Sequence, residues 1–297
     1  GFPKTLRKLV GVTRAFRPDI VQGWMYHGNL AASLVGRWVA PNARIVWGVR
    51  QALYEFGREK WSTRWVIRAG ARVSARGQTI VYNSDTARAQ HEAAGFAAAK
   101  GHVIDNGFDV DRFQPDPAAR ITVRETLGLA EQTPLIGLIA RYHPMKGHDV
   151  FLRAAAQVAQ RWREVHFVLV GREVVPENPA LSTYCGARVL DRRVHCLGER
   201  HDIPSLTASL DIASSSSWGE AFSNSVGEAM TCGVPVVATD VGDVRRIVGD
   251  AGIVVPVGDA AALAQAWDAL LSDPCRRKSM GEAGRRRVEE LFSVAVL

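Results

Sequence analysis

Short apolar segments alternate with segments of helical periodicity along most of this chain. The apolar segments lie at Asp19–Gly23, Ile45–Val49, Thr79–Asn83, His102–Asp105, Leu135–Ala140, Val165–Val170, Val194–Leu197, Leu210–Ala213, Val234–Thr239 and Gly252–Val255. Helices are predicted at Asn29–Val39, Ser84–Ala94, His148–Arg161, Ser223–Met230, Ala260–Leu271 and Arg276–Leu291. Parallel strands joined by crossover helices give this alternation, because each helix carries the chain back across a face of the sheet. The sequence therefore predicts an α/β fold.

The chain is long enough for two domains. Its 297 residues exceed the usual size of one domain, and 47% of them are hydrophobic, which suffices for a sizeable core. Asn106 and Gly107 mark a turn, and a polar stretch follows as far as Pro117. We therefore expect a first domain over residues 1–113 and a second over residues 114–297.

Nothing in the sequence predicts a membrane span or a signal peptide. No apolar run approaches the about 20 residues that a membrane helix needs, and the first residues do not have the pattern of a secretory signal. The four cysteines show neither a C-x-x-C pair nor metal-ligand spacing, which favours ordinary reduced thiols. These features predict a cytoplasmic protein without a metal site.

Positive charge is concentrated in the first third of the chain. Residues 1–100 hold 16 Lys or Arg against 5 Asp or Glu, a net charge of +11, whereas residues 101–297 hold 21 against 25, a net charge of −4. From Arg58 to Arg76, basic residues recur between Trp61, Trp65 and aliphatic residues, as on an amphipathic basic helix. Such a helix suits an anionic membrane surface; the alternative is a solvated face whose tryptophans pack on the domain core. Nucleic acid is not an expected partner, because no recognition motif accompanies the charge.

Two glutamates eight positions apart, Glu220 and Glu228, mark a candidate site. Ser223, Asn224 and Ser225, which lie between them, are residue types that favour the N-terminus of a helix. The unpaired N–H groups and the positive end of the helix dipole attract phosphate there. A nearby carboxylate accepts hydrogen bonds from hydroxyl groups, so the combination suits a ligand that carries both phosphate and hydroxyl groups.

The residues that follow strengthen this interpretation. Cys232–Asp243 is typical of a helix end, a buried strand and a Gly-rich loop after that strand's carboxyl end, where open parallel sheets bind ligands. The Glu-x7-Glu pair followed by this stretch resembles the donor-site signature of retaining glycosyltransferases of family 4. Residues 17–27, 82–88 and 103–113 resemble parts of the first domain of the same family.

This resemblance implies the GT-B fold, in which two Rossmann-like domains face each other across a cleft. In the family, a strand, a Gly-rich turn and a helix open the first domain, and residue 1 of this chain falls after them. The chain also stops near Phe292, before the last helix of the family. We therefore expect an incomplete N-terminal domain on the acceptor side and a C-terminal domain that binds the nucleotide-sugar donor.

Two cations, Arg141 and Lys146, follow an apolar strand and match the family's Arg-x4-Lys-Gly pattern. Arginine offers a planar fork of donors and lysine a point charge, so the pair can hold a diphosphate and stabilise it as it leaves, without a metal ion. By resemblance, Glu228 accepts hydrogen bonds from the ribose hydroxyls and Glu220 lies against the donor sugar. Because retaining GT-B enzymes are thought to react on one face of the sugar, Glu220 is expected to position the sugar rather than to attack it.

The resemblance implies further contacts with the donor. They are the backbone amides of Ala221, Phe222 and Ser223 for sugar or phosphate oxygens, Glu199 and Arg200 in a loop that resembles the base-contacting loop, and Gly171 at a neighbouring strand end as a further donor-binding residue. The alternatives are that Gly171 only relieves crowding at a strand end and that Glu199 and Arg200 are solvated loop residues.

His27 and Arg50 are the candidates in the first domain. His27 follows an inner strand and is expected to meet the donor sugar or the acceptor; a packed or capping histidine is the alternative. Many members of the family carry a histidine after the next strand, where this chain has Val46–Arg50. That departure favours a role for Arg50 with a phosphate-bearing acceptor.

The motifs and the resemblance together predict a retaining, metal-independent glycosyltransferase. It would move a sugar from a nucleotide diphosphate sugar, used as a co-substrate with no cofactor, to a hydroxyl on a saccharide or lipid-linked acceptor in polysaccharide or glycolipid biosynthesis. Two alternatives stay open: a nucleotide-sugar 2-epimerase of GT-B fold, and a donor-binding module with weak catalysis. The expected location is the cytoplasm, with the inner face of the membrane as the surface for the basic segment.

Overall fold

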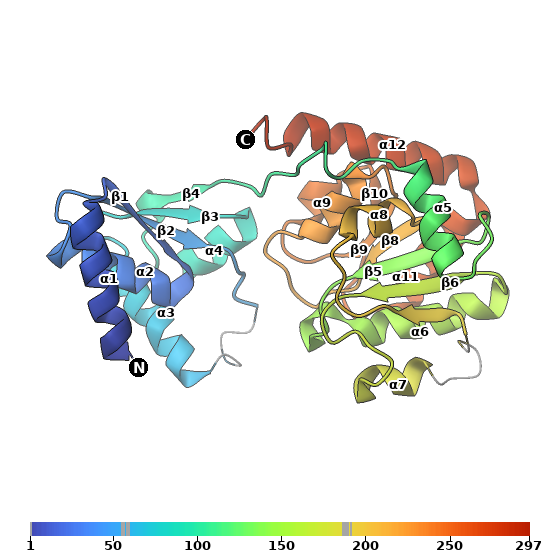
Figure 1. The fold of residues 1–297 in the computed structure, drawn as a ribbon, viewed down its shortest axis with the longest axis horizontal. Coiled ribbons are helices and arrows are strands. Elements are labelled where there is room, and N and C mark those ends of the chain that lie inside the picture. The colour runs from blue at the N-terminus through green and yellow to red at the C-terminus, as the bar shows by residue number, and fades with distance from the viewer. Residues whose placement is uncertain (1, 55–56, 58–59, 186–189, 191) are drawn as a thin grey trace. The chain divides into compact units, whose positions relative to one another are not determined.

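The computed structural model describes residues 2–54, 57, 60–185, 190 and 192–297 (Figure 1). The chain divides into two compact units, unit 1 at Gly1–Asp105 and unit 2 at Asn106–Leu297. Each unit contains a parallel sheet with helices between successive strands, so the predicted α/β fold is confirmed.

The division of the chain precedes the boundary that we expected after residue 113, because the intervening segment packs on unit 2. The Phe108 N–H donates to the Phe292 carbonyl at 2.8 Å. The Phe108 ring also stacks on Phe222, with 6.0 Å between centroids.

Within the described residues, unit 1 has four parallel strands in the order β1-β2-β3-β4. The strands are β1 Ile20–Trp24, β2 Arg44–Val49, β3 Thr79–Tyr82 and β4 Gly101–Val103. The helices are α1 Phe2–Phe16, α2 Met25–Trp38, α3 Trp61–Val73, α4 Asp85–Ala93 and the short 3-10 helix η2 Ala98–Lys100. Gly23 lets the chain pass from β1 directly into α2, because a Cβ at this position would lie 2.6 Å from the Asn29 backbone.

The described part of unit 2 has six parallel strands in the order β10-β9-β8-β5-β6-β7. They are β5 Leu135–Ile139, β6 His166–Val170, β7 Val194–Cys196, β8 Ile212–Ser215, β9 Val236–Thr239 and β10 Gly252–Val255. The helices are α5 Pro117–Thr126, η3 Pro144–Lys146, α6 His148–Arg161, α7 Pro179–Cys185, α8 Ile203–Ala208, α9 Asn224–Thr231, α10 Val244–Val248, α11 Ala260–Ser272 and α12 Pro274–Leu291.

The strand order of unit 2 determines where a ligand can enter. Numbered within the unit, it is the 3-2-1-4-5-6 order of dinucleotide-binding sheets. Successive strands are added on one side as far as β7 and then on the other side from β8 onward. The loops after β5 and β8 therefore lead in opposite directions and leave a crevice at the carboxyl edge of the sheet.

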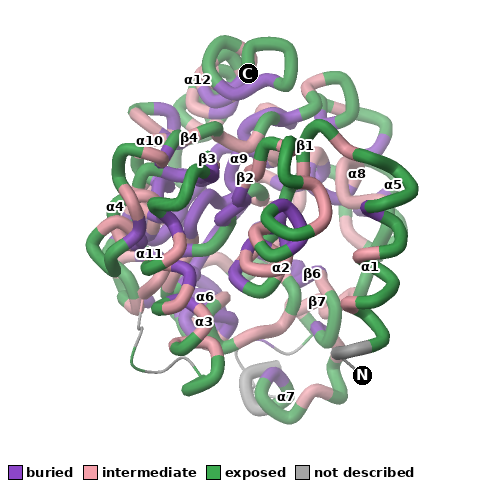
Figure 2. Tube along the Cα trace, turned by 90° about the vertical axis from the view of Figure 1, so that its left-hand side faces the viewer, coloured by how far each residue is buried: buried purple, intermediate pink, exposed green. Residues whose placement is uncertain are grey.

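The core of unit 2 packs α6 and α11 against the sheet. Phe151 of α6 and Phe167 of β6 surround Trp267 of α11, with ring centroids 4.9 and 6.1 Å from that of Trp267. Strand β9 is buried along its whole length, which agrees with its continuous run of apolar residues in a sheet covered on both faces. Buried and exposed residues alternate along the helices, as expected when one helix face packs on a sheet (Figure 2).

Candidate active site

The loops after β5 and β8 meet at the point in the unit 2 sheet where the strand order reverses. Lys146 ends the helix η3 after β5, and its Nζ lies 2.5 Å from Oε1 of Glu220, which follows β8. Ser217 Oγ donates to the same carboxylate oxygen at 2.7 Å. The fold thus brings a predicted cation and a predicted carboxylate together across 74 residues of sequence.

Glycines allow the backbones of these loops to approach each other. Gly147 has a φ of 63°, and a Cβ there would lie 1.9 Å from the Ser216 carbonyl oxygen. Ser216 Oγ in turn donates to the Gly147 carbonyl at 2.9 Å. Gly242, with a φ of 54°, lets the loop after β9 pass against the Glu220 backbone, because a Cβ there would lie 2.2 Å from the Glu220 carbonyl oxygen. The position of Glu220 is therefore fixed from two neighbouring loops.

The Lys146–Glu220 pair is partly shielded from solvent. The side chains are 26% and 14% exposed. Partial burial weakens screening, so the attraction is stronger than that of a surface pair, yet a ligand can still reach both groups. An anion that binds Lys146 would compete with Glu220, whereas a hydroxyl group could donate to Glu220 beside it.

A second group of predicted residues gathers around a cavity of about 380 Å³ at the same sheet edge. Arg141, Gly171, Glu199 and Arg200 all line it. The Arg200 guanidinium makes two hydrogen bonds to the Asp202 carboxylate, at 2.8 and 2.7 Å, so its fork is already occupied in part. Arg141 is exposed and follows β5 directly.

Gly171 has a steric reason to be glycine. Its φ is 153°, and a Cβ would lie 2.3 Å from the Ala140 carbonyl oxygen. The chain leaving β6 therefore passes against the chain leaving β5. This contact accounts for the glycine whether or not a nucleotide base approaches it.

The helix α9 begins at Asn224, one residue after the predicted start at Ser223. Ser223 is its N-cap residue but makes no side-chain capping hydrogen bond. The first-turn N–H groups are thus left without the usual side-chain acceptor. Ala221, Phe222 and Ser223 have buried side chains. A ligand contact of these three residues would therefore use their backbone.

Glu228 lies in the second turn of α9 and is half-buried. Burial raises the pKa of the Glu228 carboxyl, and the nearby Arg112 guanidinium acts in the opposite direction. A partly desolvated carboxylate gains from hydrogen-bond donors such as ligand hydroxyl groups.

In unit 1, His27 and Arg50 lie at the carboxyl ends of the adjacent strands β1 and β2. His27 is the third residue of α2 and is exposed, so it is not a packed core residue. Arg50 is exposed, and its guanidinium lies 5.2 Å from the centre of the Trp24 ring. Both candidates thus share one edge of the unit 1 sheet.

The basic segment forms the predicted helix, α3. Trp61 and Trp65 are 70% and 60% exposed, whereas Ile67 and Gly70 are buried. The alternative in which these tryptophans pack on the core is therefore wrong. Arg58, the first basic residue of the predicted segment, lies outside the described residues. No helix in the described part of the chain is long and apolar enough to cross a membrane.

Sequence reasoning missed two residues beside the predicted site. Ser217 donates a hydrogen bond to the Glu220 carboxylate. The positive charge of Arg112 acts on the Glu228 carboxyl and lowers its pKa, against the effect of burial. A signal for Ser217 exists in the run Ser214–Ser217, because four successive serines at a strand's carboxyl end are unusual for a purely structural strand. Arg112 carries no such signal, since only the fold brings it near α9. Among the described residues, no group of three or more His, Cys, Asp or Glu is placed to hold a metal ion.

Two family models match this chain. The model described as Glycosyltransferase Family 4 matches residues 1–112. The model described as Glycosyl transferases group 1 matches residues 133–273. The first match covers unit 1 and the first residues of unit 2. The second match covers the sheet of unit 2.

Several characterised proteins are similar to this chain. D-inositol 3-phosphate glycosyltransferase of Xylanimonas cellulosilytica is 36% identical over 203 residues, which are 64% of this chain and 47% of that protein. GDP-mannose-dependent alpha-(1-6)-phosphatidylinositol monomannoside mannosyltransferase of Mycobacterium tuberculosis is 30% identical over 268 residues, covering 84% of this chain and 68% of that protein. The chain therefore spans about half to two thirds of the length of these relatives.

Among solved structures, Anabaena HepE in complex with UDP and glucose superposes on this chain with a TM-score of 0.87. The match covers 98% of this chain and 78% of HepE at 24% identity. A likeness at this level of identity concerns the fold.

Proposed function

The chain belongs to glycosyltransferase family 4, and we propose from this premise that it is a retaining glycosyltransferase acting on a nucleotide diphosphate sugar and a hydroxyl acceptor. The observation that carries the proposal is the Lys146–Glu220 pair at the point where the strand order of the unit 2 sheet reverses. Arg141 lies in the loop after β5, which also carries Lys146. A cation for the departing diphosphate and a carboxylate for the sugar thus share one crevice. We place the reaction in polysaccharide or glycolipid biosynthesis.

The proposed mechanism divides the donor among named groups. Arg141 and Lys146 bind the diphosphate and stabilise the charge that grows on it as the bond to the sugar breaks. Glu220 accepts a hydrogen bond from a sugar hydroxyl and stabilises positive charge at the reacting carbon. Ser217 keeps the Glu220 carboxylate in place when the diphosphate draws Lys146 away. The backbone amides of Ala221, Phe222 and Ser223 serve sugar or phosphate oxygens.

Metal is not required in this proposal, because fixed cations neutralise the diphosphate. The base lies in the cavity lined by Gly171, Glu199 and Arg200, and Glu228 accepts hydrogen bonds from the ribose hydroxyls. In unit 1, His27 and Arg50 serve the sugar and the acceptor. The curated relatives are named for acceptors that contain inositol phosphate or phosphatidylinositol. An acceptor bearing phosphate would suit the exposed Arg50 guanidinium.

A donor screen tests the proposed activity. Nucleoside diphosphates, UDP-sugars and GDP-sugars should raise the melting temperature of the protein, and the best donor should be consumed only when a hydroxyl acceptor is present. Activity should persist in EDTA. Donor conversion without acceptor would instead support the 2-epimerase, and binding without any conversion would support the donor-binding module.

We expect substitution of Glu228 to affect nucleotide binding and substitution of Glu220 to affect the rate of transfer. Glu228→Ala should weaken binding of a free nucleoside diphosphate by roughly 1.5 to 3 kcal/mol, the value for hydrogen bonds to a charged group. Glu220→Ala should leave that binding nearly unchanged yet slow transfer. Calorimetry of both variants beside Glu282→Ala, an exposed glutamate of α12, measures the difference. The reverse pattern would exchange the two roles.

We also propose that unit 1 associates with the anionic inner face of the cytoplasmic membrane through α3. Its exposed tryptophans and its basic residues favour the membrane interface, where each cation contributes about 1 kcal/mol. Binding to anionic vesicles should fall as salt rises and should weaken in Arg64→Gln/Arg72→Gln. Arg163→Gln/Lys278→Gln, an equal loss of charge in unit 2, is the control. Equal binding to neutral vesicles would contradict the proposal.

A further inference from the structure

A cavity of about 830 Å³ lies in unit 1, and none of the residues proposed above for the donor or the acceptor lines it. It opens between the second half of α2, the end of α3 and the first residues of β2 and β3. His27 and Arg50 mark the carboxyl edge of this sheet, so the cavity lies at the opposite, amino edge. Its volume is in the range of small-molecule sites.

One wall of the cavity is apolar. Leu30 and Leu34 come from α2, Ile45 from β2 and Val73 from the end of α3. Leu34 is 49% exposed, which leaves an aliphatic side chain open to solvent at this wall. Gly36 allows α2 to lie close to β2, because a Cβ there would lie 2.0 Å from Ile45 Cδ1.

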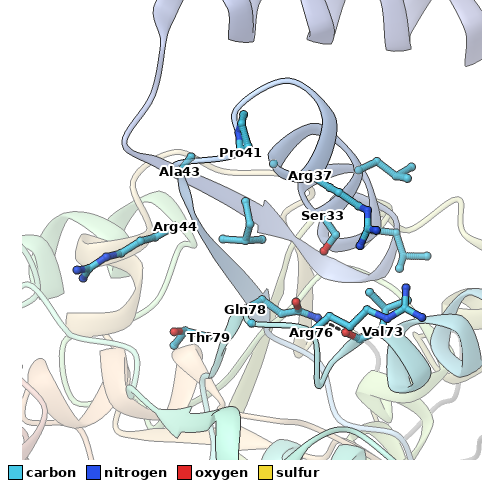
Figure 3. Close-up of a pocket in the computed structure, with 14 residues that line it drawn as sticks. Ser33, Arg37, Pro41, Ala43, Arg44, Val73, Arg76, Gln78 and Thr79 are labelled. Atoms are coloured by element: carbon cyan, nitrogen blue, oxygen red, sulfur yellow. Dashed lines mark hydrogen bonds between the residues drawn. The ribbon is translucent and has the colours of Figure 1, made fainter.

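The charged groups at the cavity are all cationic, and Ser33, Gln78 and Thr79 are its neutral polar side chains. Arg37, Arg44 and Arg76 line it, and no carboxylate occurs among its described lining residues. Figure 3 shows Arg37 and Arg76 on the same side of the cavity, whereas Arg44 points away from them. The Arg37 guanidinium lies 5.5 Å from the centre of the Trp38 ring, and Trp38 is 72% exposed. The arginines thus form a positively charged end of the cavity beside the aliphatic wall, and the Trp38 ring lies next to Arg37.

We propose that this cavity binds an acidic phospholipid, with its phosphate between Arg37 and Arg76 and an acyl chain along Leu30, Leu34, Ile45 and Val73. Two guanidinium groups match the fork geometry of a phosphate, and positive charge with no carboxylate among the described lining residues favours an anion. The aliphatic wall can bury an acyl chain, a favourable contribution to binding that inorganic phosphate cannot make. Trp38 is of the type that stays at a lipid–water interface.

The test uses short-chain lipids below their micelle concentration, which separates the cavity from a general affinity of α3 for bilayers. Calorimetry should show binding of dioctanoyl phosphatidic acid, and much weaker binding of dioctanoyl phosphatidylcholine and of glycerol 3-phosphate. Arg37→Gln/Arg76→Gln should weaken the binding of phosphatidic acid about tenfold to a hundredfold, as expected for lost hydrogen bonds to a charged group. Leu34→Asp should weaken it as well, through the apolar wall.

Lys4→Gln/Arg7→Gln on α1 removes the same charge from unit 1 outside the cavity and should bind phosphatidic acid normally. An equal loss in this control would overturn the proposal, because the lipid would then respond to net charge alone. Equal binding of glycerol 3-phosphate would reduce the site to an anion site, and equal binding of phosphatidylcholine would remove the role of the arginines. The circular dichroism spectrum and the thermal melting of each variant, compared with those of the parent protein, report whether unit 1 is folded.

Discussion

Arg141→Ala and Lys146→Ala should each lower the rate of sugar transfer on the order of a hundredfold or more. That is the scale observed when one preorganised donor to a developing charge is removed. Lys146 should be the more informative position, because its loss also removes the ion pair that it makes with Glu220. Steady-state assays with the donor found by the thermal screen measure the effect. The fall should appear in turnover at saturating donor.

Arg153→Ala is the matched control for this pair. Arg153 lies on α6, after the same loop, and pairs with Asp149 at the surface at 3.2 Å. Its removal should leave transfer unchanged, because a surface pair contributes little. If a folded Arg141→Ala/Lys146→Ala protein still transferred sugar at a near-normal rate, the two residues could not form the diphosphate clamp.

Asp211→Ala should destabilise unit 2 by about 3 to 5 kcal/mol, the cost of leaving a buried charge without its partner. The Asp211 carboxylate accepts hydrogen bonds from Arg120 at 2.9 Å, from Arg124 at 2.7 Å and from the Leu135 N–H at 2.8 Å. Arg124 is 1% exposed, and burial lowers the pKa of its guanidinium. This network ties α5 to the start of β5, the strand that leads to Arg141.

Urea denaturation followed by circular dichroism measures this effect. Asp149→Ala, which removes an exposed carboxylate, should change the free energy of unfolding by less than about 1 kcal/mol. Arg124→Leu/Asp211→Leu removes both charges and should cost less than Asp211→Ala alone. A double variant as unstable as the single one would show that the carboxylate acts through the Leu135 backbone instead.

Much of the fold follows from local sequence patterns. The alternation of apolar and helical segments predicts the parallel sheets, and the run that forms β9 is buried along its length as expected. The Glu-x7-Glu and Arg-x4-Lys-Gly motifs pointed to a glycosyltransferase family, and the family matches confirm that resemblance. Motifs and periodicity succeed here because they depend on neighbours in the chain.

Positions that depend on distant contacts were less predictable. The predicted strand Leu210–Ala213 begins two residues later, as β8 Ile212–Ser215. The Asp211 side chain joins the arginine network, while the Asp211 N–H donates to the Leu135 carbonyl of β5 at 2.9 Å. Trp61 and Trp65 face solvent, although their hydrophobicity was equally compatible with a place in the core.

The sequence by itself determined most of the strands and the longer helices between them, together with the family and hence the candidate residues. Only the tertiary structure decided that Lys146 and Ser217 share the Glu220 carboxylate, and that Arg37 and Arg76 line one cavity together with an apolar wall. The reason is physical. Strand order in a parallel sheet is decided by crossover connections and by packing of the whole core, so residues that meet at a sheet edge carry no common signal in the chain.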